Sequence, residues 1–99
     1  MPLYVMIGRN GDDAVAKRPA VRPRHLEHLK VLEREGRIKL AGPLLEADGK
    51  TPCGSLVVFE AESHDAARAV VEQDPYVVDG VFASYDVRAF TLGFPERDA

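Results

Sequence analysis

The sequence predicts an α+β domain in which two helices cover one face of a four-stranded antiparallel sheet. Three observations lead to this prediction. Four short apolar segments have the composition of strands, and two longer segments carry the apolar spacing or the end signals of helices. These segments follow one another in the order β-α-β-β-α-β, which is the order of the ferredoxin-like arrangement.

The first half of the predicted fold is a strand, a helix and a second strand. Residues 3–8 form a continuous apolar run closed by glycine, which is typical of a buried strand. Residues 9–22 are polar, contain an Asn-Gly dipeptide and have no clear period, so they predict a connection. Residues 23–36 begin with a proline and end at a glycine, the end signals of a helix. Residues 37–45 alternate like a strand, and Pro43 restricts that strand to an edge of the sheet or to its own end.

The second half repeats the pattern after a turn at 46–52. Residues 54–61 are strongly apolar and predict a strand. Ser63 is a suitable N-cap for a helix over 64–74, which the following proline stops. Residues 81–92 predict the last strand, followed by a polar tail.

Composition fits one domain over residues 1–99, because 45% of the residues are hydrophobic and 29% are charged. The 13 basic and 16 acidic residues are interspersed and give a net charge of −3, so nucleic acid and anionic membranes are not expected partners. A single cysteine excludes an internal disulfide and suits a reducing compartment. No signal peptide or membrane-spanning run is visible, so we expect a cytoplasmic protein.

The two strands predicted at 3–8 and 54–61 are apolar on both faces, although helices can cover only one face. We therefore expect a homodimer with its sheets packed face to face, because an exposed apolar face of that size is a liability. The alternative, a long loop folded over the sheet, is disfavoured because the longest irregular stretch is polar.

Two titratable residues fall on apolar helix faces. At about 100° per residue, His25 lies within the stripe of leucines of the first helix, and Asp74 points inward between Val70 and Val71. The strand order brings the start of the first helix and the end of the second to the same edge of the sheet. We therefore expect His25 and Asp74 to be neighbours.

A carboxylate beside an imidazole fixes the ring tautomer and leaves the second nitrogen free for a substrate, as in a general base. Each residue is also expected at a helix end whose dipole disfavours its charged form, so that the two would compensate each other. A purely structural His–Asp bond that satisfies two buried polar groups explains the same pattern.

At these residues the sequence resembles the YCII-related family. This resemblance implies the dimeric α+β-barrel form of the fold, similar in shape to muconolactone isomerases and to a dehydrochlorinase of a chlorinated hydroxymuconate. It also implies an active site at His25 and Asp74, whereas most members of the family have no assigned substrate. The matching segments are RPRHL (22–26), GRIKLAGPL (36–44), GSLVVFEA (54–61) and DPYVVDGVF (74–82).

Further candidates lie near the same edge. A basic cluster there can hold a carboxylate-bearing substrate, although a solvated basic loop balanced by acidic residues explains it equally well. Its members are Arg9, Lys17, Arg18, Arg22 and Arg24, of which Arg18 and Arg22 match arginines of the family pattern.

Gly42 and Pro43 end the second strand at this edge and are expected to line a substrate site. Tyr76 is expected either to line that site or to lie in an interface. His25, His28 and Asp74 lack a fourth ligand, so no metal is expected. No phosphate-binding loop or nucleophile elbow is present, so no cofactor is expected.

These features support two hypotheses. The first is a small cofactor-independent enzyme of isomerase or lyase type, acting on a small, anionic carbonyl compound. His25 would be its general acid and base, Asp74 the carboxylate that orients His25, and Arg18 or Arg22 the anion-binding group. The alternative is a non-catalytic module that binds a small molecule in the same dimer pocket.

Overall fold

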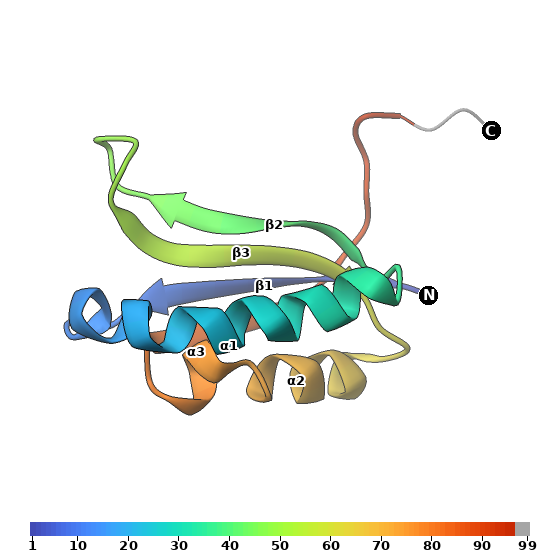
Figure 1. The fold of residues 1–99 in the computed structure, drawn as a ribbon. Helices are drawn as coiled ribbons and strands as arrows, with labels where there is room; N and C mark the ends of the chain where they lie inside the picture. Colours follow the sequence, from blue (N-terminus) through green and yellow to red (C-terminus); the bar gives the residue numbers. More distant parts are fainter. Residues whose placement is uncertain (97–99) are drawn as a thin grey trace.

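The computed structural model describes residues 1–96 and confirms the predicted α+β class (Figure 1). One additional short helix, α3, precedes the last strand. The elements are β1 (Leu3–Asn10), α1 (Ala14–Arg34), β2 (Ile38–Leu45), β3 (Pro52–Glu60), α2 (His64–Glu72), α3 (Pro75–Val78) and β4 (Phe82–Phe90). The polar tail expected after residue 92 falls partly on residues 97–99, which lie outside the described part of the chain.

The strands of the described chain form one antiparallel sheet in the order β2-β3-β1-β4, and the helices lie on one side of it (Figure 1). The register aligns Tyr4 with Phe59 and Met6 with Val57 on the helix-facing side of β1 and β3. These side chains pack with Val71 of α2 in the core. The apolar run in β1 is continuous because its alternate residues face the opposite side of the sheet.

The first helix begins at Ala14, nine residues before the predicted start at residue 23, and includes Pro19 and Pro23. The prediction missed the first turns of α1 because the row of buried residues along this helix is sparse and includes a histidine. The row can be seen in the spacing of its buried residues, 7, 4 and 7 positions apart, which keeps them on one helix face. These residues are Ala14, Val21, His25 and Leu32.

The prolines are compatible with this longer helix because both are exposed. A proline within a helix deprives the carbonyl four residues earlier of its hydrogen-bond donor. Those carbonyls belong to Val15 and Pro19, two exposed residues that water can reach.

The second helix ends at Glu72, so the prediction that Asp74 lies in its last turn is wrong. Asp74 instead caps the N-terminus of α3, where its side chain accepts a hydrogen bond from the backbone N–H of Tyr76. Pro75 ends one helix and occupies the first turn of the next, where its missing N–H costs nothing.

Two further expectations are confirmed. β2 is an edge strand, and its Pro43 is aligned with Ser55 of β3. Ser63 caps α2 by accepting a hydrogen bond of 3.1 Å from the backbone N–H of Ala66.

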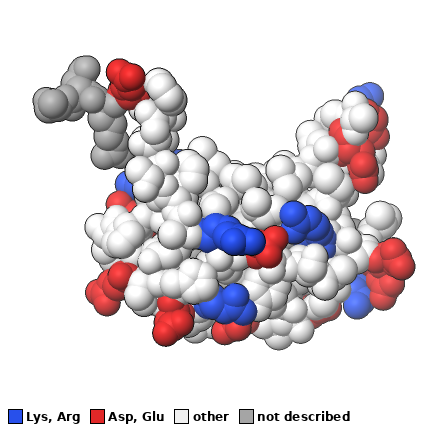
Figure 2. Space-filling model, turned by 180° about the vertical axis from the view of Figure 1, so that it is seen from behind, with Lys and Arg blue, Asp and Glu red and all other residues white. Residues whose placement is uncertain are grey.

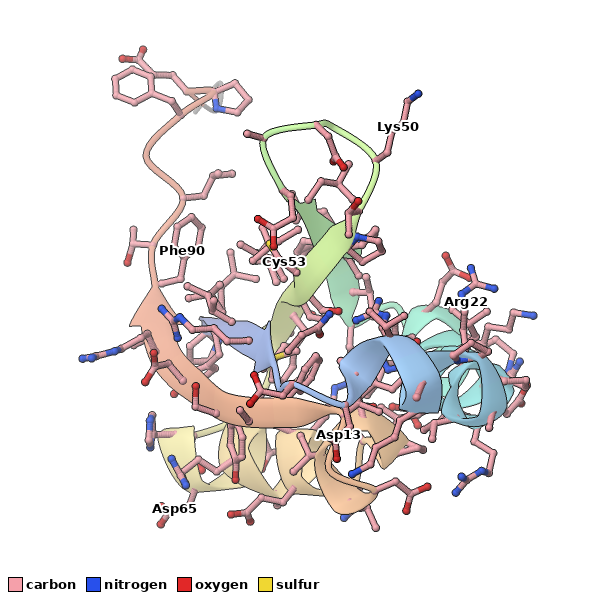
Figure 3. The ribbon with its side chains drawn as sticks, turned by 90° about the vertical axis from the view of Figure 1, so that its left-hand side faces the viewer. Asp13, Arg22, Lys50, Cys53, Asp65 and Phe90 are labelled. Carbon is pink, nitrogen blue, oxygen red and sulfur yellow. The ribbon has the colours of Figure 1, made fainter. Side chains whose placement is uncertain are left out.

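The side of the sheet opposite the helices is open. Figure 3 shows the sheet as a curved trough, flanked by the β2–β3 turn that carries Lys50 and by the segment that begins at Phe90. An apolar row of Val5, Val58 and Leu40 crosses this side, and Leu40 is 55% exposed.

No helix within residues 1–96 is long and apolar enough to cross a membrane.

The close approach of β3 to β1 yields a stability prediction. A Cβ added to Gly54 would lie 2.1 Å from the backbone oxygen of Gly8, so the strands would have to separate. We expect Gly54→Ala to lower the free energy of unfolding by about 1–3 kcal/mol in urea denaturation, as overpacking does. Gly42→Ala is the control, because its Cβ would meet nothing within 4 Å. Equal stability of the two variants would contradict this packing.

Candidate functional site

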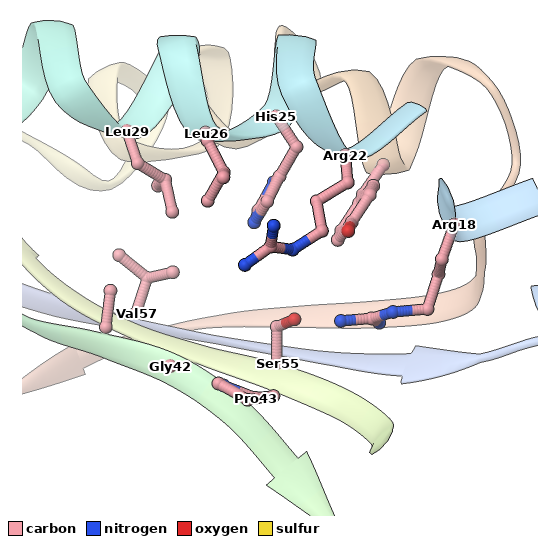
Figure 4. Close-up of a pocket in the computed structure, with 11 residues that line it drawn as sticks. Arg18, Arg22, His25, Leu26, Leu29, Gly42, Pro43, Ser55 and Val57 are labelled. Carbon is pink, nitrogen blue, oxygen red and sulfur yellow. The ribbon is translucent and has the colours of Figure 1, made fainter. Parts of the chain in front are cut away.

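A cavity of about 220 Å³ lies between α1 and the β2–β3 half of the sheet (Figure 4). α1 forms its roof, the two strands form its floor, and α3 contributes one aromatic ring. The lining residues are Arg18, Arg22, His25, Leu26 and Leu29 of α1, Ala41, Gly42 and Pro43 of β2, Ser55 and Val57 of β3, and Tyr76 of α3.

His25 and Asp74 are neighbours, as the sequence predicts. His25 Nδ1 lies 2.7 Å from Asp74 Oδ1, and the two side chains are only 7% and 3% exposed. An ionised carboxylate can only accept hydrogen bonds, so the proton of the neutral ring belongs on Nδ1. Nε2 is thereby left free. Figure 4 shows the ring pointing from α1 into the cavity, whereas Asp74 is not among the residues that line the cavity.

The expected helix-end electrostatics of this pair are wrong for both residues. His25 lies in the middle of α1, because the helix begins at Ala14. Asp74 precedes the N-terminus of α3, where backbone N–H groups favour an anion rather than disfavour it. Its Oδ1 accepts from His25 and also, at 2.9 Å, from the backbone N–H of Tyr76. The carboxylate therefore has two donors despite its burial.

Tyr76 stacks on His25 with the ring centroids 3.8 Å apart and the planes 6° from parallel. Its hydroxyl is buried and has no hydrogen-bond partner among residues 1–96. Burial raises the pKa of Tyr76, although the charges of Arg18 and Arg22 oppose this shift. The phenol consequently stays protonated at neutral pH and can donate a hydrogen bond.

Only part of the predicted basic cluster reaches the cavity. Arg18 and Arg22 line it, and Figure 4 shows the Arg18 guanidinium at one end and the Arg22 guanidinium near the middle, below His25 in this view. Arg18 also lies over the Tyr76 ring, 4.7 Å from its centroid, and donates to Asn10 Oδ1 at 3.0 Å. Both arginines share a helix face with His25. The sequence did not predict this shared face, because residues 9–22 were expected to form a connection.

The other three basic side chains do not line the cavity and pair with carboxylates instead. Arg9 contacts Asp86, Lys17 contacts Asp13 and Arg24 contacts Asp79.

A second histidine lies near the pair on its other side. His28 and Asp74 both border a small apolar pocket next to Val70. Burial lowers the pKa of His28, with Asp74 opposing and His25 reinforcing that shift. Within residues 1–96, no group of three His, Cys, Asp or Glu side chains is placed to hold a metal ion.

Ser55 is a cavity residue that the sequence analysis missed. It is only 4% exposed, and Figure 4 shows its hydroxyl pointing from β3 toward α1. Its signal in the sequence is its position, two residues before Val57 and four before Phe59, on the strand face that packs against the helices. A polar residue at such a position is informative because buried polar groups require a partner.

Comparison with known proteins identifies relatives over most of the chain. Residues 2–91 match the family described as the YCII-related domain. Protein YciI of Escherichia coli O6:H1 is 41% identical over 97 residues, covering 93% of this chain and 99% of its own. An uncharacterized Haemophilus influenzae protein is 38% identical over 96 residues, covering 92% of this chain and 98% of its own.

Solved structures share the fold. The 5-chloro-2-hydroxyhydroquinone dehydrochlorinase of Burkholderia phenoliruptrix, in complex with 2,5-dihydroxybenzoquinone, is 30% identical with a TM-score of 0.82, covering 92% of this chain and 95% of its own. Its name refers to a chlorinated hydroquinone, not to the hydroxymuconate expected above. An antibiotic biosynthesis monooxygenase, 13% identical with a TM-score of 0.55 and covering 92% of this chain and 97% of its own, is similar in fold alone.

The double use of Asp74 as an acceptor predicts a stability effect. Asp74→Ala would leave the Nδ1–H of His25 and the backbone N–H of Tyr76 without their acceptor. We expect a loss of about 1–3 kcal/mol in the free energy of unfolding, measured by urea denaturation. Asp86→Ala, which removes only the exposed contact with Arg9, should cost less than about 1 kcal/mol. Similar losses in both variants would show that the two buried hydrogen bonds contribute no more than the exposed Arg9–Asp86 contact.

Proposed function

Because this chain belongs to the YCII-related domain family, we propose that it is a small cofactor-independent enzyme that moves a proton on a small, anionic carbonyl compound. The observation that carries the proposal is the buried His25–Asp74 pair, with one imidazole nitrogen facing a cavity that also contains two guanidinium groups. The reaction is of isomerase or lyase type.

In the proposed mechanism, Nε2 of His25 accepts a proton from a carbon α or γ to the carbonyl group. The electrons of the broken C–H bond move toward the carbonyl oxygen and form an enolate. Asp74 holds the Nδ1–H bond and stabilises the imidazolium that results. The proton then returns to another carbon in an isomerisation, or the enolate expels a leaving group in a lyase reaction.

The cavity limits the size and charge of the substrate. An engineered cavity of about 150 Å³ holds benzene, so a space of about 220 Å³ suits one substituted ring or an acyclic compound of similar size. Arg18 and Arg22 would bind an anionic group, and Tyr76 would contribute a ring face or a hydroxyl. Gly42 and Pro43 would form the wall at the sheet edge.

The dehydrochlorinase supports this substrate class. Its bound compound, 2,5-dihydroxybenzoquinone, is a planar ring with several oxygen substituents. We propose that the present protein takes a compound of comparable size and charge. The alternative is a module that binds such a compound without turning it over, and the first experiment below separates the two.

Replacing the proposed base tests the proposal. We expect wild-type protein to accelerate chloride release from 5-chloro-2-hydroxyhydroquinone, or deuterium exchange into oxaloacetate or 2,5-dihydroxybenzoquinone followed by NMR. His25→Asn should reduce the accelerated rate by about 10²–10⁴-fold, the usual contribution of a general base. Asp74→Asn should reduce it as well, because it disturbs the tautomer of His25.

His64→Asn is the matched control, because His64 is exposed at the start of α2 and lies outside the cavity. It should keep the wild-type rate. If a compound binds with His25-dependent affinity but is neither exchanged nor cleaved, the enzyme proposal fails and the binding module remains.

The open side of the sheet further supports a homodimer with the sheets face to face. Figure 2 shows an uncharged hollow between the two projections that flank this side. Half-buried Leu3, Val5 and Ile7 project there from β1, and Leu40 projects from β2. A second copy with the same apolar trough would cover these side chains, and the two curved sheets would together form a barrel.

The dimer can be tested in solution. We expect sedimentation at micromolar concentration to give the mass of two chains, because covering the apolar row favours association. Leu40→Glu should shift the equilibrium toward the monomer by placing a charge in that row, whereas Val15→Glu, on the exposed side of α1, should not. A wild-type protein that stays monomeric would refute the arrangement.

A further inference from the structure

The cavity has two chemically different ends, with a hydroxyl group between them. Arg18 lies at one end, Leu29 and Val57 lie at the other, and the guanidinium of Arg22 reaches toward the middle (Figure 4). His25 projects from the roof between these ends, and Ser55 projects from the floor (Figure 4). A compound bound with its anionic group at Arg18 and Arg22 would therefore present its neighbouring atoms to the imidazole of His25 and to the hydroxyl of Ser55.

We propose that Ser55 binds the substrate and donates a hydrogen bond to the carbonyl oxygen that becomes negative when His25 removes the proton. This inference rests on the proposed function and makes the substrate class narrower. The substrate carries an anionic group at one end and, in its middle, a carbonyl oxygen directed toward the floor of the cavity. A simple carboxylate without that second oxygen would fill the site only partly.

Ser55 faces the cavity because it shares the helix-facing side of β3 with Val57 and Phe59, and its neighbours in the sheet offer it no side-chain partner. The register places it between Gly8 of β1 and Pro43 of β2, which carry no polar side chain. The ring of Phe82 covers Gly8 so closely that a Cβ there would lie 2.6 Å from a ring carbon. The arrangement leaves the cavity as the direction in which the hydroxyl can find a partner.

The hydrogen bonds around the cavity are already formed without Ser55. They join His25 and the backbone N–H of Tyr76 to Asp74, and Arg18 to Asn10. None of the side-chain hydrogen bonds between residues 1–96 involves Ser55, and its hydroxyl faces the cavity, where a bound molecule or a water can bond to it. A bound substrate oxygen would supply the partner.

The proposed role balances the charges of the reaction. The proton moves from carbon to Nε2 of His25, and the electron pair moves to the carbonyl oxygen on the side of the floor. A donor already aimed at that oxygen stabilises the enolate more than the neutral carbonyl and so lowers the barrier. The buried hydroxyl of Tyr76, which also has no partner among residues 1–96, is a second donor at the same cavity.

Two probes and one substitution test the role of Ser55. 2,5-Dihydroxybenzoquinone has several ring oxygens, whereas benzoate presents only its carboxylate. We expect Ser55→Ala to weaken binding of the quinone by about 10–100-fold in calorimetric titration, as the loss of a hydrogen bond to a charged oxygen does. Binding of benzoate should stay the same, because its carboxylate is held by the arginines.

A merely structural serine predicts the opposite pattern. It would lower the melting temperature and weaken both probes equally, whereas we expect an unchanged or higher melting temperature, because the hydroxyl bonds to no side chain among residues 1–96. Ser84→Ala, on an exposed position of β4, is the matched control and should bind both probes as the wild type does. If Ser55→Ala does not fold, Ser55→Cys keeps the volume with a weaker donor and should give the same selective loss.

Three results would overturn the inference: equal quinone affinity in wild type and Ser55→Ala, equal loss of both probes, or no quinone binding by the wild type. None of these tests the base. The proposed function fails separately, when His25→Asn leaves turnover or exchange unchanged.

Discussion

The arrangement of the cavity depends on one carboxylate oxygen. Asp74 Oδ1 accepts from His25 of α1 and from the backbone N–H of Tyr76 in α3. The same atom therefore sets the orientation of the imidazole and starts the short helix that carries Tyr76. The parallel stack of the Tyr76 and His25 rings follows from this arrangement, because both are held by the same acceptor. Arg18 then lies over the tyrosine ring, so the acceptor indirectly shapes the cationic end of the cavity.

The sheet contributes what the helices cannot, a rigid floor with little side-chain bulk. Gly8 leaves room for the Phe82 ring on the helix side of the sheet, and Gly54 allows β3 to approach β1 closely. β2 lies at the edge of the sheet, where Pro43 costs no internal ladder hydrogen bond. The cavity lies between this edge strand, β3 and α1. This cavity is separate from the middle of the core, which lies between α2 and the strands β1 and β3.

The sequence was sufficient to predict the order of the four strands along the chain, the restriction that Pro43 places on β2 and the pairing of His25 with Asp74. It was insufficient for the helix ends. The predicted start of α1 was nine residues too late. Its four buried residues, one of them a histidine, are too few to give a recognisable period in the sequence. Asp74 was assigned to the wrong helix because Pro75 both stops α2 and begins α3. The prediction that His25 and Asp74 are neighbours was nevertheless correct. It depends on the phase of the helices and on the order of the strands, which do not change with the positions of the helix ends. Ser55 was missed because a lone polar residue in an apolar strand gives no period.

The burial of the pair bears on whether it is only structural. A His–Asp bond that merely satisfied two buried groups would be most stable with both imidazole nitrogens bonded inside the protein, since an unpaired buried nitrogen costs free energy. Here one nitrogen is bonded to Asp74 and the ring lines a cavity that also contains two guanidinium groups and a buried serine hydroxyl. Apolar side chains of similar volume would stabilise such a site at least as well as a buried polar pair does. The stability of the fold therefore does not account for this combination of groups, whereas binding and deprotonating an anionic carbonyl compound would use each of them.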